Sequence, residues 1–178
     1  YNCGYPTWPA GAANVHGDVI QINASDSGGT FLIHDNVIHS TGRDTNGNEC
    51  ESMLIGNPGE TDYVWNNVIY NLQGNEPALV QNSLPGTAAS FWNNTITGGG
   101  TAGSTTPSGY CLRAGHSTSG MSTIELRNNH CITTAGRAAD PSLSAATKRV
   151  SNNVTQTPAT ASAQGFSSGA TYAYAPPS

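Results

Sequence analysis

Short apolar segments, each interrupted by a pair of polar residues, recur along most of this chain. In each, a β-favouring run leads into Asn-Asn (Asp-Asn in the first copy) and then into a second β-favouring run, as in residues 63–71, YVWNNVIYN. Internal repeats of roughly 20–50 residues are typical of solenoids, propellers and arrays. The pattern therefore predicts a solenoid. The second asparagine of each pair is Asn36, Asn67, Asn94, Asn129 or Asn153.

A second series of β-favouring runs precedes the Asn-pair strands, at residues 19–23, 53–57, 78–82 and 111–115. Each repeat thus contains about three short strands, and no segment shows a sustained helical period. We expect a single all-β domain over residues 1–178. Residues 1–15 would form an irregular N-terminal lid and residues 16–156 the repeats. Residues 157–178 would form a C-terminal tail or cap, unless the natural chain continues.

Alignment of the repeats predicts which side chains stack in columns. Because side chains alternate along a strand, three apolar columns with polar neighbours describe a core. The asparagines would form a ladder at one corner, since asparagine tolerates a left-handed backbone and its amide can bond to neighbouring repeats. The predicted core columns are Ile33, Val64, Phe91, Leu126 and Val150; Ile20, Leu54, Leu79 and Leu112; and Ile38, Ile69, Ile96 and Cys131.

A fourth column lies next to the first and should point outward. It consists of His34, Trp65, Trp92, Arg127 and Ser151, with Tyr63 and Tyr70 near the same face. Two tryptophans on adjacent repeats would make a flat aromatic platform with a polar rim. Such surfaces suit sugar rings, whose C–H faces stack on aromatic rings while their hydroxyls meet polar groups. The alternative is that a loop covers these rings as a small satellite cluster.

The low charge of the chain and the lack of long apolar stretches argue against two classes of function, nucleic-acid binding and membrane spanning. Among 178 residues, 10% are charged, the net charge is −5, and the six lysines and arginines are scattered. No basic patch is present to neutralise phosphates, so we expect no nucleic-acid partner. No stretch approaches the roughly 18–20 apolar residues of a membrane span. The chain has no initiator methionine or targeting segment, which suggests a processed or trimmed form.

Four cysteines, none in a CxxC pair, argue against a zinc site. An even count in a chain rich in Ser, Thr and Asn fits an oxidising compartment, so we expect a secreted, extracellular protein. Of the three pairings that four cysteines allow, we favour Cys3 with Cys50 and Cys111 with Cys131. The second pair lies within one repeat, and the first would hold the N-terminal segment in place.

Three short strands per repeat, aliphatic columns and an asparagine ladder resemble the right-handed parallel β-helix proteins of the pectate-lyase-like superfamily. The resemblance spans about residues 15–156, and the segments HGDVIQ (16–21) and WNNVI (65–69) also resemble secreted bacterial β-helix proteins. It implies a right-handed β-helix (a β-solenoid) of about five coils that binds or acts on an acidic or plant-type polysaccharide. Function varies widely on this fold, so the implication is an analogy.

Catalysis would require more than the fold. A polysaccharide lyase needs a base, a group that neutralises the uronate carboxylate and often Ca²⁺, whereas a glycoside hydrolase needs two carboxylates across the bond. The Asp-rich pairs of the polygalacturonases and the Arg-containing signature of the pectate lyases are absent, so the sequence does not decide whether the protein cleaves a polysaccharide. His16 and Asp18 lack a third ligand, and we predict no metal or cofactor unless a lyase binds Ca²⁺. The candidate residues are His34, His39, Asp35, Asp44, Glu49, Glu51, Glu60, Asp62, Arg113 and Arg127.

Two function hypotheses follow. The first is a secreted carbohydrate-active protein that binds a polysaccharide or cell-surface glycan along Trp65, Trp92, Tyr63, Tyr70 and Arg113, with or without lyase or hydrolase activity. The second is a non-catalytic structural, adhesive or self-assembling surface module whose copies stack end to end. Ice or mineral binding by threonine ranks is set aside, because only Thr95 and Thr97 stand at regular strand spacing.

Overall fold

The computed structural model of the chain describes residues 16–22, 28–39, 49–55, 59–70, 79–80, 86–98, 109–114 and 120–166. These residues form fourteen strands and one short helix. The predicted lid at residues 1–15 and the residues that follow Phe166 lie outside the described part. The elements are β1 (His16–Gln21), β2 (Gly29–His34), β3 (Val37–His39), β4 (Glu49–Ile55), β5 (Glu60–Trp65), β6 (Val68–Tyr70), β7 (Leu79–Val80), β8 (Ala88–Trp92), β9 (Thr95–Thr97), β10 (Arg113–Ala114), β11 (Thr123–Arg127), β12 (His130–Ile132), β13 (Thr147–Ser151), β14 (Val154–Gln156) and α1 (Pro158–Ala163).

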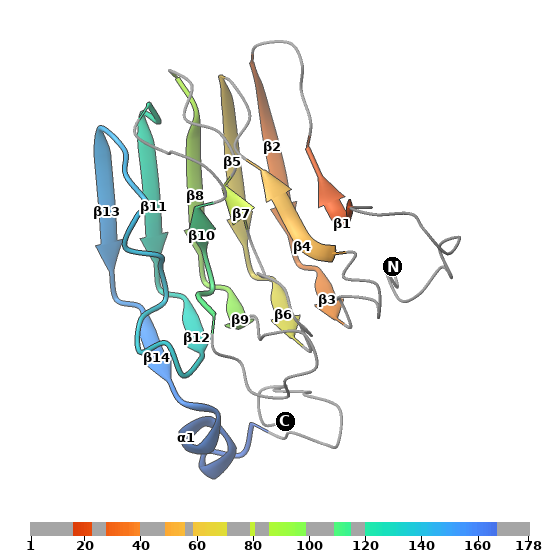
Figure 1. Ribbon diagram of the computed structural model, residues 1–178, viewed down its shortest axis with the longest axis vertical. Helices are drawn as coiled ribbons and strands as arrows, with labels where there is room; N and C mark the ends of the chain where they lie inside the picture. Colours follow the sequence, from red (N-terminus) through yellow and green to blue (C-terminus); the bar gives the residue numbers. More distant parts are fainter. Residues whose placement is uncertain are drawn as a thin grey trace.

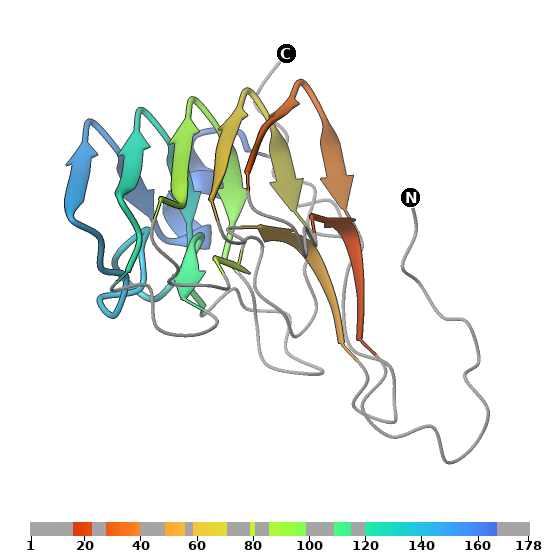
Figure 2. The ribbon, with the colours of Figure 1, turned by 90° about the horizontal axis from the view of Figure 1, so that it is seen from above.

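The strands form three parallel sheets. Sheet A has the order β1-β4-β7-β10, sheet B the order β13-β11-β8-β5-β2, and sheet C the order β14-β12-β9-β6-β3. Successive strands of the chain thus enter different sheets, and each strand pairs with its equivalent in the next repeat, as Figures 1 and 2 show. The prediction of an all-β fold built from repeats is confirmed, and the arrangement is compatible with a solenoid.

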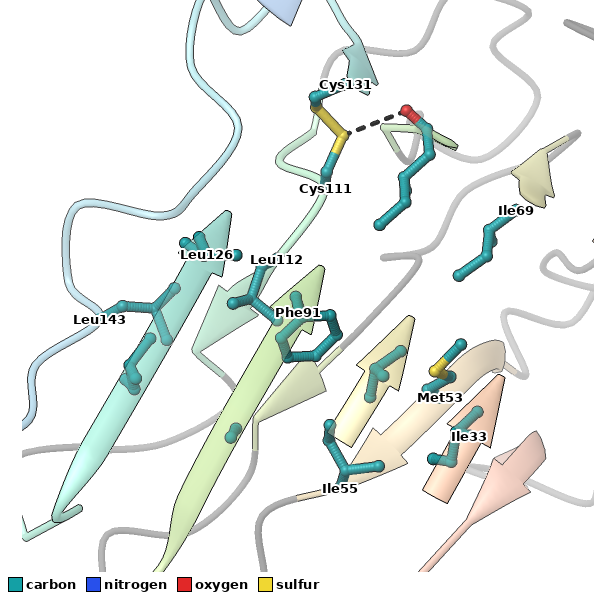
Figure 3. Packing of buried hydrophobic residues seen from close by; sticks show 14 of the residues in the cluster. Ile33, Met53, Ile55, Ile69, Phe91, Cys111, Leu112, Leu126, Cys131 and Leu143 are labelled. Carbon is teal, nitrogen blue, oxygen red and sulfur yellow. Dashed lines mark hydrogen bonds between the residues drawn. A yellow bond between two sulfur atoms is a disulfide. The ribbon is translucent and has the colours of Figure 1, made fainter. Parts of the chain in front are cut away.

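Sheets B and C have the register that the sequence pattern predicts. Ile33 pairs with Val64, and the same column continues through the equivalent residues of β8, β11 and β13. Ile38 pairs with Ile69, and that column continues through β9 and β12. These side chains are buried except at the last repeat, where Val150 is 53% exposed. They pack against sheet A residues such as Met53 inside the molecule (Figure 3).

The predicted register of sheet A is wrong by one residue at two places. Ile20 pairs with Met53, whereas Leu54 pairs with Gln21. Leu79 pairs with Arg113, not with the preceding Leu112. A shift of one residue moves a side chain to the other face of a strand. Met53 and Leu54 are adjacent and both apolar, so the sequence alone does not tell which of them faces the core.

At the corner between sheets B and C, the two residues of each Asn pair have different roles. The first residue of each pair adopts the left-handed conformation, with φ between 53° and 56°. The second forms the ladder: the backbone N–H and the side-chain amide of Asn67 both donate to Asn94 Oδ1, at 3.0 Å each. The same two bonds link Asn36 to Asn67, Asn94 to Asn129, and Asn129 to Asn153. The expectation that the ladder residue itself is left-handed is therefore wrong.

The helix α1 departs from the sequence expectation, which placed no helix anywhere. Thr157 caps it by accepting a hydrogen bond from the Thr160 N–H, and Pro158 occupies the first turn, where its missing N–H costs nothing. Ala161 is buried with Ile132 and contacts Phe166. Ile132 is adjacent to the core residue Cys131, so α1 covers the outer face of sheet C near β12.

One predicted disulfide is confirmed. Cys111 and Cys131 are bonded, with their Cα atoms 6.1 Å apart, and both are buried. The bond ties the segment before β10 to β12, which Figure 3 shows at one end of the buried cluster. The other predicted pair falls outside what is described, because the position of Cys3 and the side chain of Cys50 are not described.

Candidate binding face

The outward face of sheet B carries the predicted aromatic column. Along β5, burial alternates, so that Tyr63 and Trp65 point away from the core and Val64 points into it. Trp65 pairs with His34 on one side and with Trp92 on the other. Trp92 pairs in turn with Arg127. The outward column thus runs in register across the sheet, with the side chains in the order that the repeat alignment predicts.

An open depression of about 500 Å³ lies on this face. Both tryptophans and Tyr63 are half-buried, so the described residues leave part of each ring accessible. Leu32, in the column next to His34, is 60% exposed at the edge of the depression. Side chains from three adjacent repeats therefore build one apolar floor. The lining residues are Leu32, Tyr63, Trp65, Trp92 and Asn93.

At the N-terminal end of the column, the side chains of His34, Trp65 and Asp35 interact through a ring stack and a hydrogen bond. The His34 ring stacks on Trp65, with centroids 4.2 Å apart and planes 13° from parallel. His34 Nδ1 lies 2.7 Å from Asp35 Oδ2. The hydrogen bond with His34, assisted by one with Asn66, lowers the pKa of Asp35. His34 and Asp35 were both predicted as catalytic candidates, and the structure brings them together.

At the other end, Glu125 orients the platform. The Trp92 Nε1–H donates to Glu125 Oε2 at 3.1 Å, and Arg127 Nη2 donates to Glu125 Oε1. Glu125 is 5% exposed. The hydrogen bond from Arg127, more than that from Trp92, lowers the pKa of Glu125 against the opposing effect of burial. Glu125 was not among the site residues predicted from the sequence. Its spacing of two residues from Arg127 on one strand was the available signal.

Several predicted site residues lie away from this face. Asp62 and Glu60 are fully buried on the inward side of β5, so neither faces the aromatic column. Tyr70 belongs to sheet C and Arg113 to sheet A. Asp62 was predicted as a catalytic candidate. The correction follows from strand alternation, because Asp62 is two residues from the core residue Val64. The side chains of His16, Asp18, His39, Glu49 and Glu51 are not described, and Asp44 lies outside the described residues.

A threonine column also runs along the outward face of sheet B. Thr30 pairs with Thr61, Thr61 with Ala88, Ala88 with Thr123, and Thr123 with Thr147. The expectation that regular threonines occur only at Thr95 and Thr97 is therefore wrong. That expectation came from aligning the repeats on the Asn pairs and the apolar runs beside them. The four threonines of sheet B stand before those apolar runs and so were not compared. The column is interrupted by Ala88 and borders the aromatic depression.

Among the described residues, no three His, Cys, Asp or Glu side chains are grouped so that they could hold a metal ion. In the same part of the chain, no helix has the length and apolar character needed to cross a membrane. Comparisons with protein-family models, with curated proteins and with solved structures find no match to this chain. The geometry of the aromatic face is therefore the main indication of function.

Proposed function

We propose that this chain is a secreted, right-handed parallel β-helix of about five coils that binds a polysaccharide along the outward face of sheet B. Right-handedness is supported by a general rule: connections between parallel strands of one sheet are right-handed in about 98% of cases. Secretion is supported by the Cys111–Cys131 disulfide, because disulfides persist mainly in oxidising compartments. The pectate-lyase-like superfamily remains a resemblance of the sequence pattern.

The observation that carries the binding proposal is the depression lined by Leu32, Tyr63, Trp65, Trp92 and Asn93. Its volume of about 500 Å³ falls within the range of about 300–1,000 Å³ that is usual for small-molecule sites. Aromatic and aliphatic side chains make up most of its lining, and Asn93 adds a polar side chain. Sugar rings present the same combination, with C–H groups on their faces and hydroxyls at their edges.

The site is also pre-organised. Trp92 is held by Glu125, and Trp65 is held by its stack with His34. Rings that are already fixed lose little conformational freedom when a ligand binds, which favours affinity. Because equivalent strands of adjacent repeats lie about 4.8 Å apart, successive positions of the face repeat on the scale of a sugar ring. A chain of sugars is therefore better matched to the face than a single sugar.

Cleavage has weaker support than binding. Hydrolysis needs one carboxylic acid that stays protonated, usually through a raised pKa, beside a second carboxylate. The carboxylates at the ends of this column, Asp35 and Glu125, both have lowered pKa values. Each is also hydrogen-bonded to a neighbouring cationic or imidazole side chain. We therefore propose glycan binding without cleavage as the main function. Lyase or hydrolase activity is a second candidate, which assays for unsaturated products and for new reducing ends would detect.

A binding assay with matched variants tests the proposal. The wild-type protein is incubated with a panel of insoluble glycans, and bound protein is measured after sedimentation. For a glycan that is bound, we expect Trp92→Ala to weaken binding by about 2 kcal/mol, or roughly thirtyfold, as for a buried aromatic anchor. Tyr70→Ala is the control, because it removes an aromatic ring from sheet C. Equal binding by wild type and Trp92→Ala would refute the proposed site, and no binding to any glycan would refute the function.

A further inference from the structure

The first and last repeats leave strand edges at both ends of the stack. In sheet B the terminal strands are β2 and β13, and in sheet C they are β3 and β14. Within the described part of the chain, each of these four strands pairs with one neighbour only. A strand edge of this kind presents backbone N–H and C=O groups that can pair with another chain.

Exposed apolar side chains are concentrated on the same four strands. Among the described residues, the large hydrophobic side chains classed as exposed are Leu32 (60%), Val37 (64%), Val150 (53%) and Val154 (50%). Val150 belongs to the core column in which Val64 is fully buried. The difference between them is that β5 has a neighbour on each side, whereas β13 has one neighbour among the strands that the structure describes. The exposure is thus what a missing next strand would produce.

The asparagine ladder makes the two ends complementary. On every rung, the backbone N–H of one asparagine donates to the Oδ1 of the next, in the direction from Asn36 to Asn153. Among the described residues, Asn36 Oδ1 therefore accepts no hydrogen bond, and the Asn153 backbone N–H donates none. One end of the ladder offers an acceptor and the other a donor.

We propose that copies of this chain stack head to tail, with β13 and β14 of one copy pairing with β2 and β3 of the next. In this register Asn153 would donate to Asn36 of the next copy and continue the ladder. Val150 would pack beside Ile33, and Val154 beside Val37. Because the two contacting surfaces differ, the interface is heterologous and can extend beyond a dimer. The inference goes beyond the proposed function and does not depend on glycan binding.

Lys148 sets the strength of this association. It is exposed, occupies an inward position on β13, and donates its ammonium to the Leu143 carbonyl at 2.7 Å. In the stack it would face Phe31 of the next copy. An inward-pointing charge on an edge strand opposes pairing. The stacking is therefore reversible and rises with protein concentration, and we expect Lys148→Leu to shift it toward longer assemblies.

Sedimentation velocity of the full chain, over a wide range of concentrations, tests the stacking. One variant, Leu32→Lys/Val37→Lys, places lysines on the N-terminal edge, where the first would face Arg149 of the preceding copy. A second, Val150→Lys/Val154→Lys, places lysines on the C-terminal edge. All four positions are exposed, so folding should be kept, and circular dichroism checks this. The matched control, Thr95→Lys/Thr123→Lys, places two lysines on middle repeats.

We expect the average mass of wild type and control to rise with concentration, and each edge variant to stay monomeric. An equimolar mixture of the two edge variants should form dimers and nothing larger, because only one compatible pair of edges remains. This outcome separates head-to-tail stacking from a two-fold dimer and from non-specific aggregation. A mixture that stays monomeric overturns the proposal. The proposal is also overturned if wild type and the Lys148→Leu variant, measured separately, both stay monomeric at every concentration.

Discussion

Truncation of one internal rung of the ladder, Asn94→Ala, is expected to destabilise the fold strongly. Asn94 is 1% exposed. Its Oδ1 accepts the backbone N–H of Asn67 at 3.0 Å, and its amide donates to the Val64 carbonyl at 2.9 Å. Asn94 Oδ1 also accepts from the Asn67 side-chain amide, and the Asn94 amide also donates to Asn129 Oδ1. Alanine removes all four bonds and leaves the backbone N–H of Asn67, a fully buried residue, without its acceptor. The Asn67 amide keeps its bonds to the Ile33 and Trp65 carbonyls, and Asn129 Oδ1 keeps the Asn94 backbone N–H, so the two other rung bonds add little to the cost. Buried polar groups in folded proteins almost always have a hydrogen-bond partner, so the loss of this acceptor is costly.

The magnitude follows from these contacts. A buried donor left without an acceptor costs about 1–3 kcal/mol, and loss of the bond to Val64 adds about 1 kcal/mol. We therefore expect Asn94→Ala to lower the free energy of unfolding by about 2–4 kcal/mol. Small domains are stable by only about 5–15 kcal/mol in total, so the effect is large. Asn36→Ala is the matched control. Within the described residues its Oδ1 accepts no hydrogen bond, and its loss should cost less than about 1 kcal/mol.

Urea denaturation measures both variants against wild type. Tryptophan fluorescence and far-ultraviolet circular dichroism should give coincident transitions, which establishes two-state behaviour. The experiment is run at a protein concentration where every variant is monomeric, so that association does not contribute to stability. Equal costs for Asn94→Ala and Asn36→Ala, within about 0.5 kcal/mol, would refute the reasoning, because burial of the orphaned donor is the difference between them.

Two further predictions concern the corner and the aromatic face. Asn128 has φ 56°, so Asn128→Ala should cost about 1–2 kcal/mol and Asn128→Gly distinctly less, in the same urea assay; equal costs would contradict the left-handed role. The pKa of Glu125 is lowered by Arg127, so its contribution to stability is present above the unfolded glutamate pKa of about 4.3 and is lost as pH falls through the lower folded value. Glu125→Gln should therefore reduce the fall in the free energy of unfolding over this acidic pH range. Parallel curves of unfolding free energy against pH for wild type and variant would disprove this prediction.

The columns of sheets B and C were predictable because the Asn pair marks the same point in every repeat. The strands on either side of that mark are aligned by it, so Ile33 and Val64, or Trp65 and Trp92, fall in register. Sheet A has no such mark. Its strands are bounded by loops of different lengths, and two adjacent apolar residues, Met53 and Leu54, fit the core equally well in the sequence.

The candidate site was predicted in part because side chains alternate along each strand. The outward column follows from alternation, and alternation also places Asp62 inside, two residues from Val64. Tyr70 is near Trp65 in sequence but lies beyond the corner, on sheet C. The spacing of two residues from Arg127 places Glu125 on the same face, but its role in holding Trp92 follows from the contacts in the structure. Trp92 is 33 residues away from it, and no local pattern links the two.

The sequence by itself determined the repeat, the corner and the alternation of inward and outward side chains, because these depend on residues that are neighbours in the chain. Tertiary structure decided which repeats lie side by side, which sheet each strand enters and which strands form the sheet edges among the described residues. Those features depend on contacts between residues 24 to 35 positions apart in the ladder. Such contacts form only when strands from successive repeats meet, and loops of unequal length separate them.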